Sequence, residues 1–208
     1  MKKRNRGVLI VLEGIDGSGK TTQARMLLDK LQKKEVEAVY LQEPSESKWG
    51  QEIKKKAAVK NSLSPEEELD LFLKDRKENV EKNIKPALKK NQVVILDRYY
   101  FSTMAYQGAK GIDLQLIRKK NEEIIVPPDL IFVLDINAQN GLRRLQNRKK
   151  DLLFERTDYL VKVRKIFQSF QGENFIHIDA QKDKENIHRE ILRVVVRYLT
   201  RLDFVEPE

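Results

Sequence analysis

The stretch Gly14-Ile15-Asp16-Gly17-Ser18-Gly19-Lys20-Thr21 lies between an apolar run at residues 8–12 and a helical pattern that begins near Lys20. It matches the pattern G-x-x-x-x-G-K-[ST], whose glycines let backbone N–H groups surround a phosphate because no Cβ blocks the approach. In such a loop the lysine reaches the β and γ phosphates, the threonine hydroxyl can bind Mg²⁺, and the next helix adds its positive N-terminal dipole. Since the required strand and helix flank the motif, the sequence indicates a nucleotide-binding loop rather than a plain glycine-rich turn.

Strands and helices alternate along the rest of the chain. Short apolar runs predict five strands, at residues 8–13, 36–41, 93–96, 130–134 and 175–178. This alternation predicts a parallel sheet covered on both faces and joined by right-handed crossovers. We therefore expect an α/β fold of the three-layer P-loop NTPase type, with a five-stranded parallel sheet, helices on both faces and a small lid.

The helical spacing of apolar residues predicts helices at about residues 20–34, 49–59, 64–85, 99–107, 113–125, 137–149, 158–170 and 184–202. Ser64, followed by Pro65 and two glutamates, is typical of a helix N-terminus. Pro86 is expected to bend or break the long helix before it, because proline lacks the N–H group that a helix needs. Residues 150–154 are expected to form a loop.

Length and charge limit the possible organisation and partners. A chain of 208 residues suits one domain, here a P-loop kinase domain over residues 1–208, with a basic tail at 1–6 and a lid near 148–156. The net charge of +9 suits polyanionic ligands such as nucleotides, although a well-solvated, lysine-rich surface would explain it equally well. No basic stripe interleaved with aromatic residues is present, so we expect no nucleic-acid partner.

Cysteine is absent, which excludes disulfides and thiolate metal sites and permits a reducing compartment. The apolar run after the basic tail is shorter than a signal-peptide core, and no other stretch approaches a membrane span. We therefore expect a cytoplasmic protein without a membrane partner.

A phosphate loop alone does not separate a kinase from a GTPase or a motor. The sequence has no Asn-Lys-x-Asp segment, which argues against guanine recognition of the GTPase kind. Its length leaves little room for the added domains of a motor. Further motifs must therefore decide the activity.

Two pairs of residues could line a second ligand site. Phe72 and Arg76 lie four apart on one predicted helix, so an aromatic plane and a forked donor could hold one flat base. Thr103 and Tyr106 lie one helical turn apart and could form one pocket wall. The alternatives are that Phe72 is a core residue, Arg76 a surface ion-pair partner, and Thr103 and Tyr106 cap and core residues.

Asp97-Arg98-Tyr99 follows an apolar strand. This position would place the carboxylate of Asp97 near Mg²⁺ and the guanidinium of Arg98 where it could bind a second phosphate in bidentate fashion.

Together these motifs resemble the thymidylate kinase family, which phosphorylates dTMP with ATP. The resemblance is carried, over about residues 7–200, by residues 12–23, residues 71–76, Asp97-Arg98-Tyr99 with Ser102, residues 105–108, and Phe154-Glu155 followed by Val163-Arg164. The resemblance implies ATP-dependent conversion of dTMP to dTDP, ATP and dTMP as substrates, Mg²⁺ as cofactor, and a homodimer.

The resemblance also implies roles for individual residues on the dTMP side. Phe72 would stack on thymine, and Arg76 and Thr103 would hydrogen-bond its edge. Tyr106 would pack under the sugar, and Arg98 would hold the phosphate. The full dTMP-binding set is Asp16, Phe72, Arg76, Arg98, Thr103, Tyr106 and Gln107.

On the ATP side, the implied set is Gly14, Ile15, Asp16, Gly17, Ser18, Gly19, Lys20, Thr21 and Thr22, with Arg144 beside the adenine and Ala180 after the last strand. Thr21 and Asp97 would hold the metal. The implied catalytic set is Lys20, Arg98, Asp16 and Arg148. Lys149, Lys150 and Arg156 compete with Arg148 for the lid's mobile charge, and the alternative is that this cluster is a solvated basic face.

This chain departs from the family pattern at two positions. Gln42 stands where many members have arginine, so we expect one positive contact fewer at the acceptor phosphate, and Leu153 replaces the usual lid arginine. Only some members have a basic residue at the place of Ser18, so the mobile charge is expected from the lid. The alternatives to a dTMP kinase are a broad-specificity deoxynucleotide or nucleoside kinase, and a non-catalytic nucleotide-binding regulator.

Overall fold

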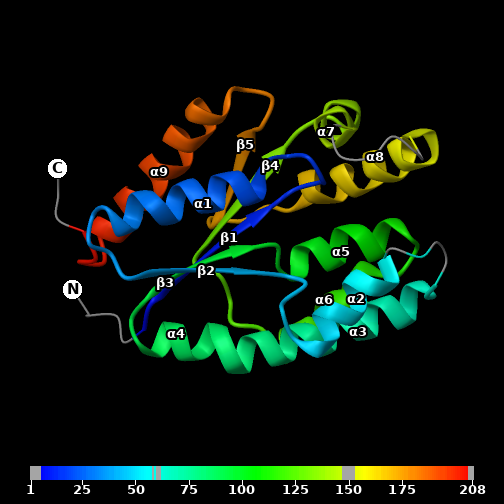
Figure 1. Ribbon diagram of the computed structural model, residues 1–208, viewed down its shortest axis with the longest axis horizontal. Coiled ribbons are helices and arrows are strands. Elements are labelled where there is room, and N and C mark those ends of the chain that lie inside the picture. Colours follow the sequence, from blue (N-terminus) through cyan, green and yellow to red (C-terminus); the bar gives the residue numbers. More distant parts are fainter. Residues whose placement is uncertain (1–5, 58, 60–61, 147–152, 206–208) are drawn as a thin grey trace.

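The structure is a computed structural model that describes residues 6–57, 59, 62–146 and 153–205 (Figure 1). Its strands are β1 (Val8–Glu13), β2 (Ala38–Gln42), β3 (Val93–Asp97), β4 (Leu130–Asp135) and β5 (Phe175–Asp179). Its helices are α1 (Lys20–Gln32), α2 (Lys48–Ala57), α3 (Pro65–Asn79), the π-helix η1 (Val80–Ile84), α4 (Lys85–Lys89), α5 (Tyr100–Ala109), α6 (Leu114–Glu122), α7 (Ala138–Gln146), α8 (Leu153–Ser169) and α9 (Lys184–Thr200).

The five strands form one parallel sheet in the order β2-β3-β1-β4-β5, which confirms the expected α/β fold. Leu12 of β1 lies opposite Asp97 of β3 and Phe132 of β4. The carboxyl ends of the central strands therefore meet at one edge. In open parallel sheets such an edge is where ligands bind.

Helices cover both faces of the sheet (Figure 1). On one face α1 packs against α9, and on the other α4 packs against β3 while α8 packs against β4 and α5. All six residues of β1 are buried, as expected of a central strand enclosed on both faces. Among the described residues, no helix is both long and apolar enough to cross a membrane.

The N-terminus of α3 is the one that the sequence predicts. Ser64 accepts a hydrogen bond from the Glu67 N–H at 3.2 Å, and the Glu67 carboxylate accepts one from the Ser64 N–H at 2.7 Å. This reciprocal pair satisfies two backbone donors that the helix itself leaves without partners.

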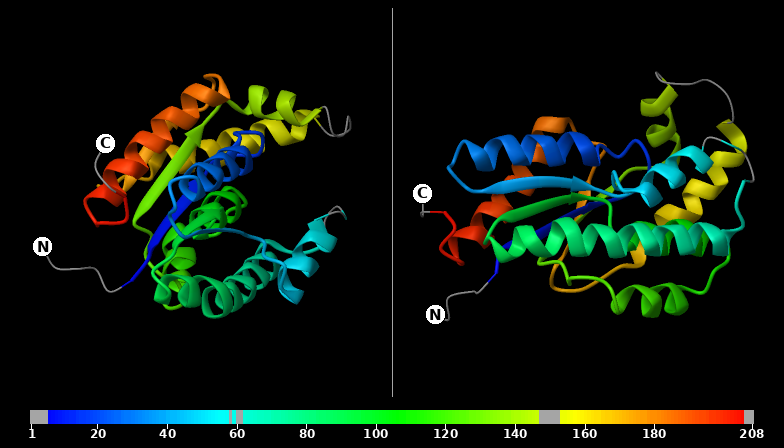
Figure 2. Two further views of the ribbon diagram at one scale, coloured as in Figure 1. Left: turned by 60° about the vertical axis from the view of Figure 1, so that its left-hand side comes forward. Right: turned by 60° about the horizontal axis from the view of Figure 1, so that its bottom comes forward.

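Pro86 does not break the helix before it. The chain passes from α3 through η1 into α4 as one long rod, seen in the right view of Figure 2. In η1 the Lys85 N–H bonds to the Val80 carbonyl, five residues back. This wider turn relieves the crowding that a proline ring imposes on a regular helix, so the helix continues.

Helix α8 begins at Leu153, five residues before the expected start at 158. The prediction of a loop over residues 150–154 is therefore wrong at its C-terminal end. Residues 153–157 contain neither glycine nor proline, so nothing in their backbone preference prevents the helix from extending toward its N-terminus.

Candidate active site

The phosphate loop joins β1 to α1, and two of its glycines show why the loop needs them. Gly17 has φ +81°, and a Cβ there would lie 2.1 Å from the Gly141 carbonyl oxygen of α7. Gly19, the N-cap of α1, has φ +97°, and no described atom lies within 4 Å of the place of its Cβ. The backbone of Gly19 is thus open to a ligand at the positive end of the helix.

Lys20 holds its ammonium group inside this loop. Its Nζ donates hydrogen bonds to the carbonyl oxygens of Gly14 at 3.0 Å and Ile15 at 2.9 Å. Burial, with the nearby Arg98 guanidinium, lowers the pKa of Lys20 to about 8. A phosphate bound here would compensate the buried positive charge and so offset the free-energy cost of burying it.

Thr21 and Asp97, the two residues expected to hold a metal, are in contact beside the loop. The Thr21 hydroxyl donates to Asp97 Oδ2, and the Tyr40 hydroxyl donates to the same oxygen at 3.3 Å. The other carboxylate oxygen, Oδ1, is buried and has no hydrogen-bond partner in the described chain. The pair fits Mg²⁺, which commonly uses one or two carboxylates and takes its remaining ligands from water and substrate phosphates.

Arg98 lies directly after β3 in a left-handed conformation, with φ +70°. Its Nη2 forms an ion pair with Asp16 of the phosphate loop, and its Nη1 donates to Ser102 Oγ at 3.1 Å. Its guanidinium lies 5.3 Å from the centre of the Tyr106 ring. A non-glycine residue in this region stores backbone strain, which is characteristic of functional sites.

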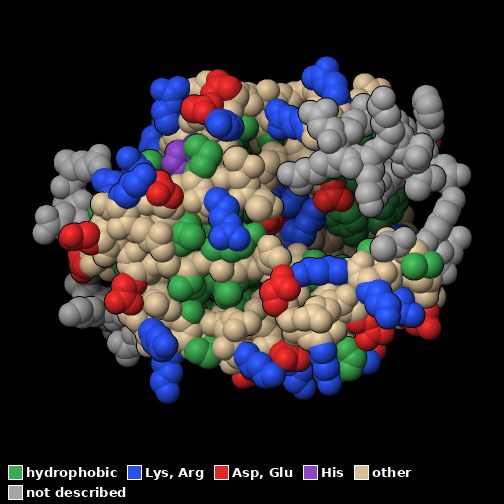
Figure 3. Space-filling model, in the orientation of Figure 1, with side chains coloured by type: hydrophobic (Ala, Val, Ile, Leu, Met, Phe, Trp, Pro, Cys, Tyr) green, Lys and Arg blue, Asp and Glu red, His purple; other side chains and the backbone are tan. Residues whose placement is uncertain are grey.

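A cavity of about 430 Å³ opens beside the loop, and all seven residues of the predicted dTMP set line it. Phe72 is only half-buried, so it is a lining residue rather than a core residue. The Tyr106 hydroxyl accepts the Asp16 N–H at 3.1 Å, and burial raises the pKa of Tyr106 to about 12. The right side of Figure 3 shows a hollow that contains basic, acidic and hydrophobic side chains.

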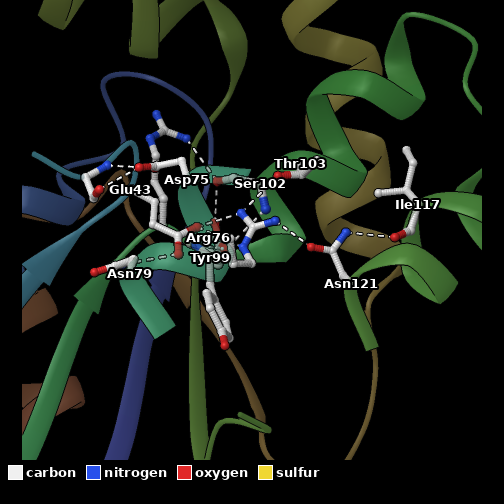
Figure 4. Close-up of polar contacts among 12 residues, drawn as sticks. Glu43, Asp75, Arg76, Asn79, Tyr99, Ser102, Thr103, Ile117 and Asn121 are labelled. Atoms are coloured by element: carbon white, nitrogen blue, oxygen red, sulfur yellow. Dashed lines mark hydrogen bonds and ion pairs between the residues drawn. The ribbon is translucent and has the colours of Figure 1, made fainter. Parts of the chain in front are cut away.

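Arg76 is a buried residue and not the surface ion-pair partner of the alternative interpretation. Figure 4 shows its polar contacts. Its Nε and Nη2 donate to Glu43 Oε2 at 2.9 and 2.6 Å, its Nη1 donates to Asn121 Oδ1 at 2.5 Å, and its Nη2 donates to Thr103 Oγ1 at 3.0 Å. These four hydrogen bonds leave a single guanidinium N–H for a ligand. Burial raises the pKa of the Glu43 carboxyl despite the neighbouring Arg76.

The loop after β2 is held by Asp75, the neighbour of Arg76 on α3. Asp75 accepts hydrogen bonds from the Ser45 N–H at 2.8 Å, the Ser45 hydroxyl at 2.5 Å and the Ser47 hydroxyl at 2.6 Å. Gln42 donates from its Nε2 to Glu46 Oε1 at 3.2 Å, and its Oε1 lies 3.0 Å from the Tyr40 hydroxyl oxygen, whose one proton it shares with Asp97. The structure thus has a neutral, hydrogen-bonded side chain where many family members have arginine.

Sequence reasoning missed several lining residues, among them Glu43, Glu68 and Tyr159. Glu68, Phe72 and Arg76 follow one another at intervals of four residues on α3, so the helical period could have revealed Glu68 as a lining residue. It accepts a hydrogen bond from Gln107 Nε2 at 2.9 Å and pairs with Lys110. Tyr159 donates from its hydroxyl to the Tyr106 carbonyl at 2.8 Å, a contact that no local pattern reveals.

Other predicted residues lie apart from the cavity or cannot be placed. Arg144 is exposed on α7 and is not among the described lining residues. Ala180 is buried after β5, where its N–H donates to the Asp135 carbonyl at 2.8 Å. Arg148, Lys149 and Lys150 lie outside the described residues, as does the side chain of Arg156.

A phosphate loop at the carboxyl edge of a parallel sheet, facing a cavity that contains its own arginines, is the arrangement of a P-loop nucleotide kinase. The family model for thymidylate kinase matches residues 12–191. A probable thymidylate kinase of Archaeoglobus fulgidus is 45% identical over 192 residues, which cover 92% of this chain and 96% of the relative. The thymidylate kinase of Brachyspira hyodysenteriae is 43% identical, over 91% and 94% of the two chains. That of Akkermansia muciniphila is 45% identical, over 88% of each chain. The chain therefore belongs to the thymidylate kinase family.

Proposed function

We propose that this enzyme transfers the γ-phosphoryl group of ATP to dTMP and releases ADP and dTDP. The observation that carries the proposal is the ion pair between Asp16 and Arg98. This ion pair joins the phosphate loop to Arg98, which lines the cavity. A donor phosphate at the loop and an acceptor phosphate at Arg98 would therefore share one chamber. The relatives named thymidylate kinase support the choice of dTMP as the acceptor.

On the donor side, residues 14–22 wrap the ATP phosphates with backbone N–H groups. Lys20 exchanges its loop carbonyls for β and γ phosphate oxygens. Thr21 and Asp97 would hold Mg²⁺, which would supply positive charge to those phosphates. Arg144 and Ala180 lie toward the adenine in this proposal.

On the acceptor side, Phe72 stacks on thymine while Thr103 and the remaining N–H of Arg76 bond to its edge. Tyr106 packs under the deoxyribose, where a 2′-hydroxyl would clash. Arg98 holds the acceptor phosphate, and Gln107 supports the pocket through its contact with Glu68.

The transfer needs position and positive charge more than it needs acid–base chemistry. An oxygen of the dTMP phosphate forms a bond to the γ phosphorus as the bond to the β–γ bridging oxygen breaks. Since the acceptor phosphate is already ionised near pH 7, no general base is required. A basic residue, Arg148 in this proposal, would add positive charge to the transferring phosphoryl group.

A coupled assay of ADP release tests the proposal, with ATP and Mg²⁺ held constant and dTMP, dUMP, dCMP and thymidine as acceptors. We expect dTMP to give the highest kcat/KM, and Lys20→Ala and Arg98→Ala to abolish most of the activity. Comparable rates with several acceptors would favour a broad-specificity kinase. ATP binding without acceptor-dependent ADP release would favour a non-catalytic regulator.

The proposal also includes a homodimer, implied by the family resemblance, and a cytoplasmic location, expected from the sequence composition. Sedimentation equilibrium of the full chain tests the first, with twice the chain mass of 24.4 kDa expected. Fractionation of the source cells tests the second.

A further inference from the structure

Glu13 is a buried carboxylate to which the proposed reaction gives no role. It ends β1, directly before the phosphate loop, and is 0% exposed. Burial of a carboxylate is costly unless its oxygens are hydrogen-bonded. The partners of Glu13 therefore show what this carboxylate does.

Within the described chain, Glu13 accepts three hydrogen bonds, and all of them come from the start of α5. Its Oε1 accepts the N–H groups of Tyr99 at 2.8 Å and Ser102 at 3.2 Å, and its Oε2 accepts the Ser102 hydroxyl at 2.6 Å. Tyr99 is the N-cap of α5, and its own side chain makes no capping hydrogen bond to the described chain. Glu13 thus caps α5 from a neighbouring strand.

The same contacts set the direction of the Ser102 hydroxyl. A hydroxyl has one proton, and here Ser102 donates it to Glu13. The Ser102 oxygen then presents its lone pairs to Arg98, whose Nη1 donates to it at 3.1 Å. With Glu13 ionised, the hydrogen bonds run in one direction, from Arg98 to Ser102 to Glu13.

We propose that Glu13 is a positioning residue that aims the Arg98 guanidinium at the acceptor phosphate through the Ser102 hydroxyl. The inference rests on the proposed role of Arg98. Arg98 and Ser102 line the cavity, whereas Glu13 is not among the described residues that do. Its effect on the reaction therefore passes through Ser102.

A carboxylate is required because Glu13 presents two acceptor oxygens to three donors. In Glu13→Gln, one end of the side chain becomes an NH₂ group that only donates. With the amide oxygen kept on the backbone N–H groups, this NH₂ points at Ser102 and turns the hydroxyl proton toward Arg98. The Nη1 of Arg98 then loses its acceptor, although the substituted side chain has almost the same shape as Glu13 and Nη2 keeps its ion pair with Asp16.

The test compares Glu13→Gln, Ser102→Ala and the double variant in the full-length enzyme, with kcat and KM measured separately for dTMP and for ATP. We expect each single variant to raise KM for dTMP about tenfold, because one hydrogen bond to a charged group is lost, with KM for ATP within about twofold. The double variant should be no worse than Glu13→Gln, since both changes break one chain of contacts. Additive effects, or unchanged KM values, would overturn the inference.

Asp129→Asn is the matched control. Asp129 is a carboxylate at the other end of β1, where it accepts the Leu9 N–H at 2.8 Å and pairs with Arg6. This variant should lower the melting temperature and leave KM for dTMP unchanged. If Glu13→Gln does not fold, Ser102→Ala decides, because both backbone N–H groups keep their Glu13 partner in that variant. A wild-type enzyme without dTMP-dependent ADP release would contradict the proposed function instead, so the two failures are distinguishable.

Discussion

The phosphate loop takes its binding groups from one short continuous stretch of backbone, whereas the cavity beside it takes them from side chains on several separate elements. The loop depends on glycine conformation and one buried ammonium. The cavity depends on a buried ion pair, Arg76 with Glu43, and on contacts between helices α3, α5 and α6. Substitutions in the cavity should therefore lower the folding stability, whereas substitutions in the loop should mainly weaken nucleotide binding.

Replacing Arg76 with methionine should have the largest effect. It leaves the Glu43 carboxylate buried without its charged partner, so we expect the free energy of unfolding to fall by about 3 to 5 kcal/mol. Urea unfolding, followed by circular dichroism, measures the loss. Adding Glu43→Gln to this variant should recover part of the stability, because the lone buried charge is then removed.

An exposed pair serves as the control for Arg76. Asp29 of α1 and Lys33, the C-cap of that helix, form an exposed ion pair with Oδ2 and Nζ 2.7 Å apart. Lys33→Ala should therefore change stability by less than about 0.5 kcal/mol. Equal losses from Lys33→Ala and Arg76→Met would show that the cavity network is no more than a surface ion pair in energetic terms.

Lys20→Ala, on the donor side, should lower the activity without lowering the stability. We expect kcat to fall by about 10² to 10³-fold, because a charge that stabilises the transferring phosphoryl group is removed. The melting temperature should stay the same or rise, since burial disfavours the charged ammonium. Lys30→Ala, an exposed lysine on the same helix, should retain full activity. A large fall in stability for Lys20→Ala would contradict the distinction between loop and cavity.

Gly19→Ala and Gly111→Ala separate backbone strain from ligand approach. Both glycines have positive φ, +97° and +104°, and neither has a described atom within 4 Å of its Cβ position. Each variant should therefore lose about 1 to 2 kcal/mol of stability from strain. Only Gly19→Ala should raise KM for ATP by more than about tenfold, because its methyl group would occupy the proposed phosphate position. A similar KM in the two variants would argue that no phosphate lies against Gly19.

The same distinction explains how much could be predicted from the sequence. The phosphate loop, the five strands and the Ser64 cap depend on neighbours in the chain, so local patterns revealed them. Phe72 and Arg76 could be paired by helical period, and the cavity brings them together with Asp16 and Arg98.

The partners of Arg76 could not be predicted in this way. Asn121, which lies 45 residues further along the chain, donates from its amide to the Ile117 carbonyl at 2.7 Å, and this bond turns its oxygen toward Arg76. Such a contact exists only after α6 has packed against α3. The early start of α8 was missed for a different reason, because backbone preference alone does not fix where a helix begins.

The pH dependence of stability should show the smallest effect. It depends on Glu13, which directly precedes the phosphate loop and accepts a hydrogen bond from Ser102 of the cavity. Burial raises the pKa of Glu13 to about 7, although Ser102 and the charges of Arg98 and Lys20 oppose the shift. The Glu13 carboxyl therefore stays protonated to a higher pH in the folded protein than in the unfolded chain. The stability that this difference contributes is fully present below about pH 4.5 and is lost as pH rises through about 7. Between pH 6 and pH 8 the wild type should lose about 1 kcal/mol more of its unfolding free energy than Glu13→Gln does. Urea unfolding of both proteins at the two pH values measures the difference, and equal losses would show that Glu13 stays ionised across this range.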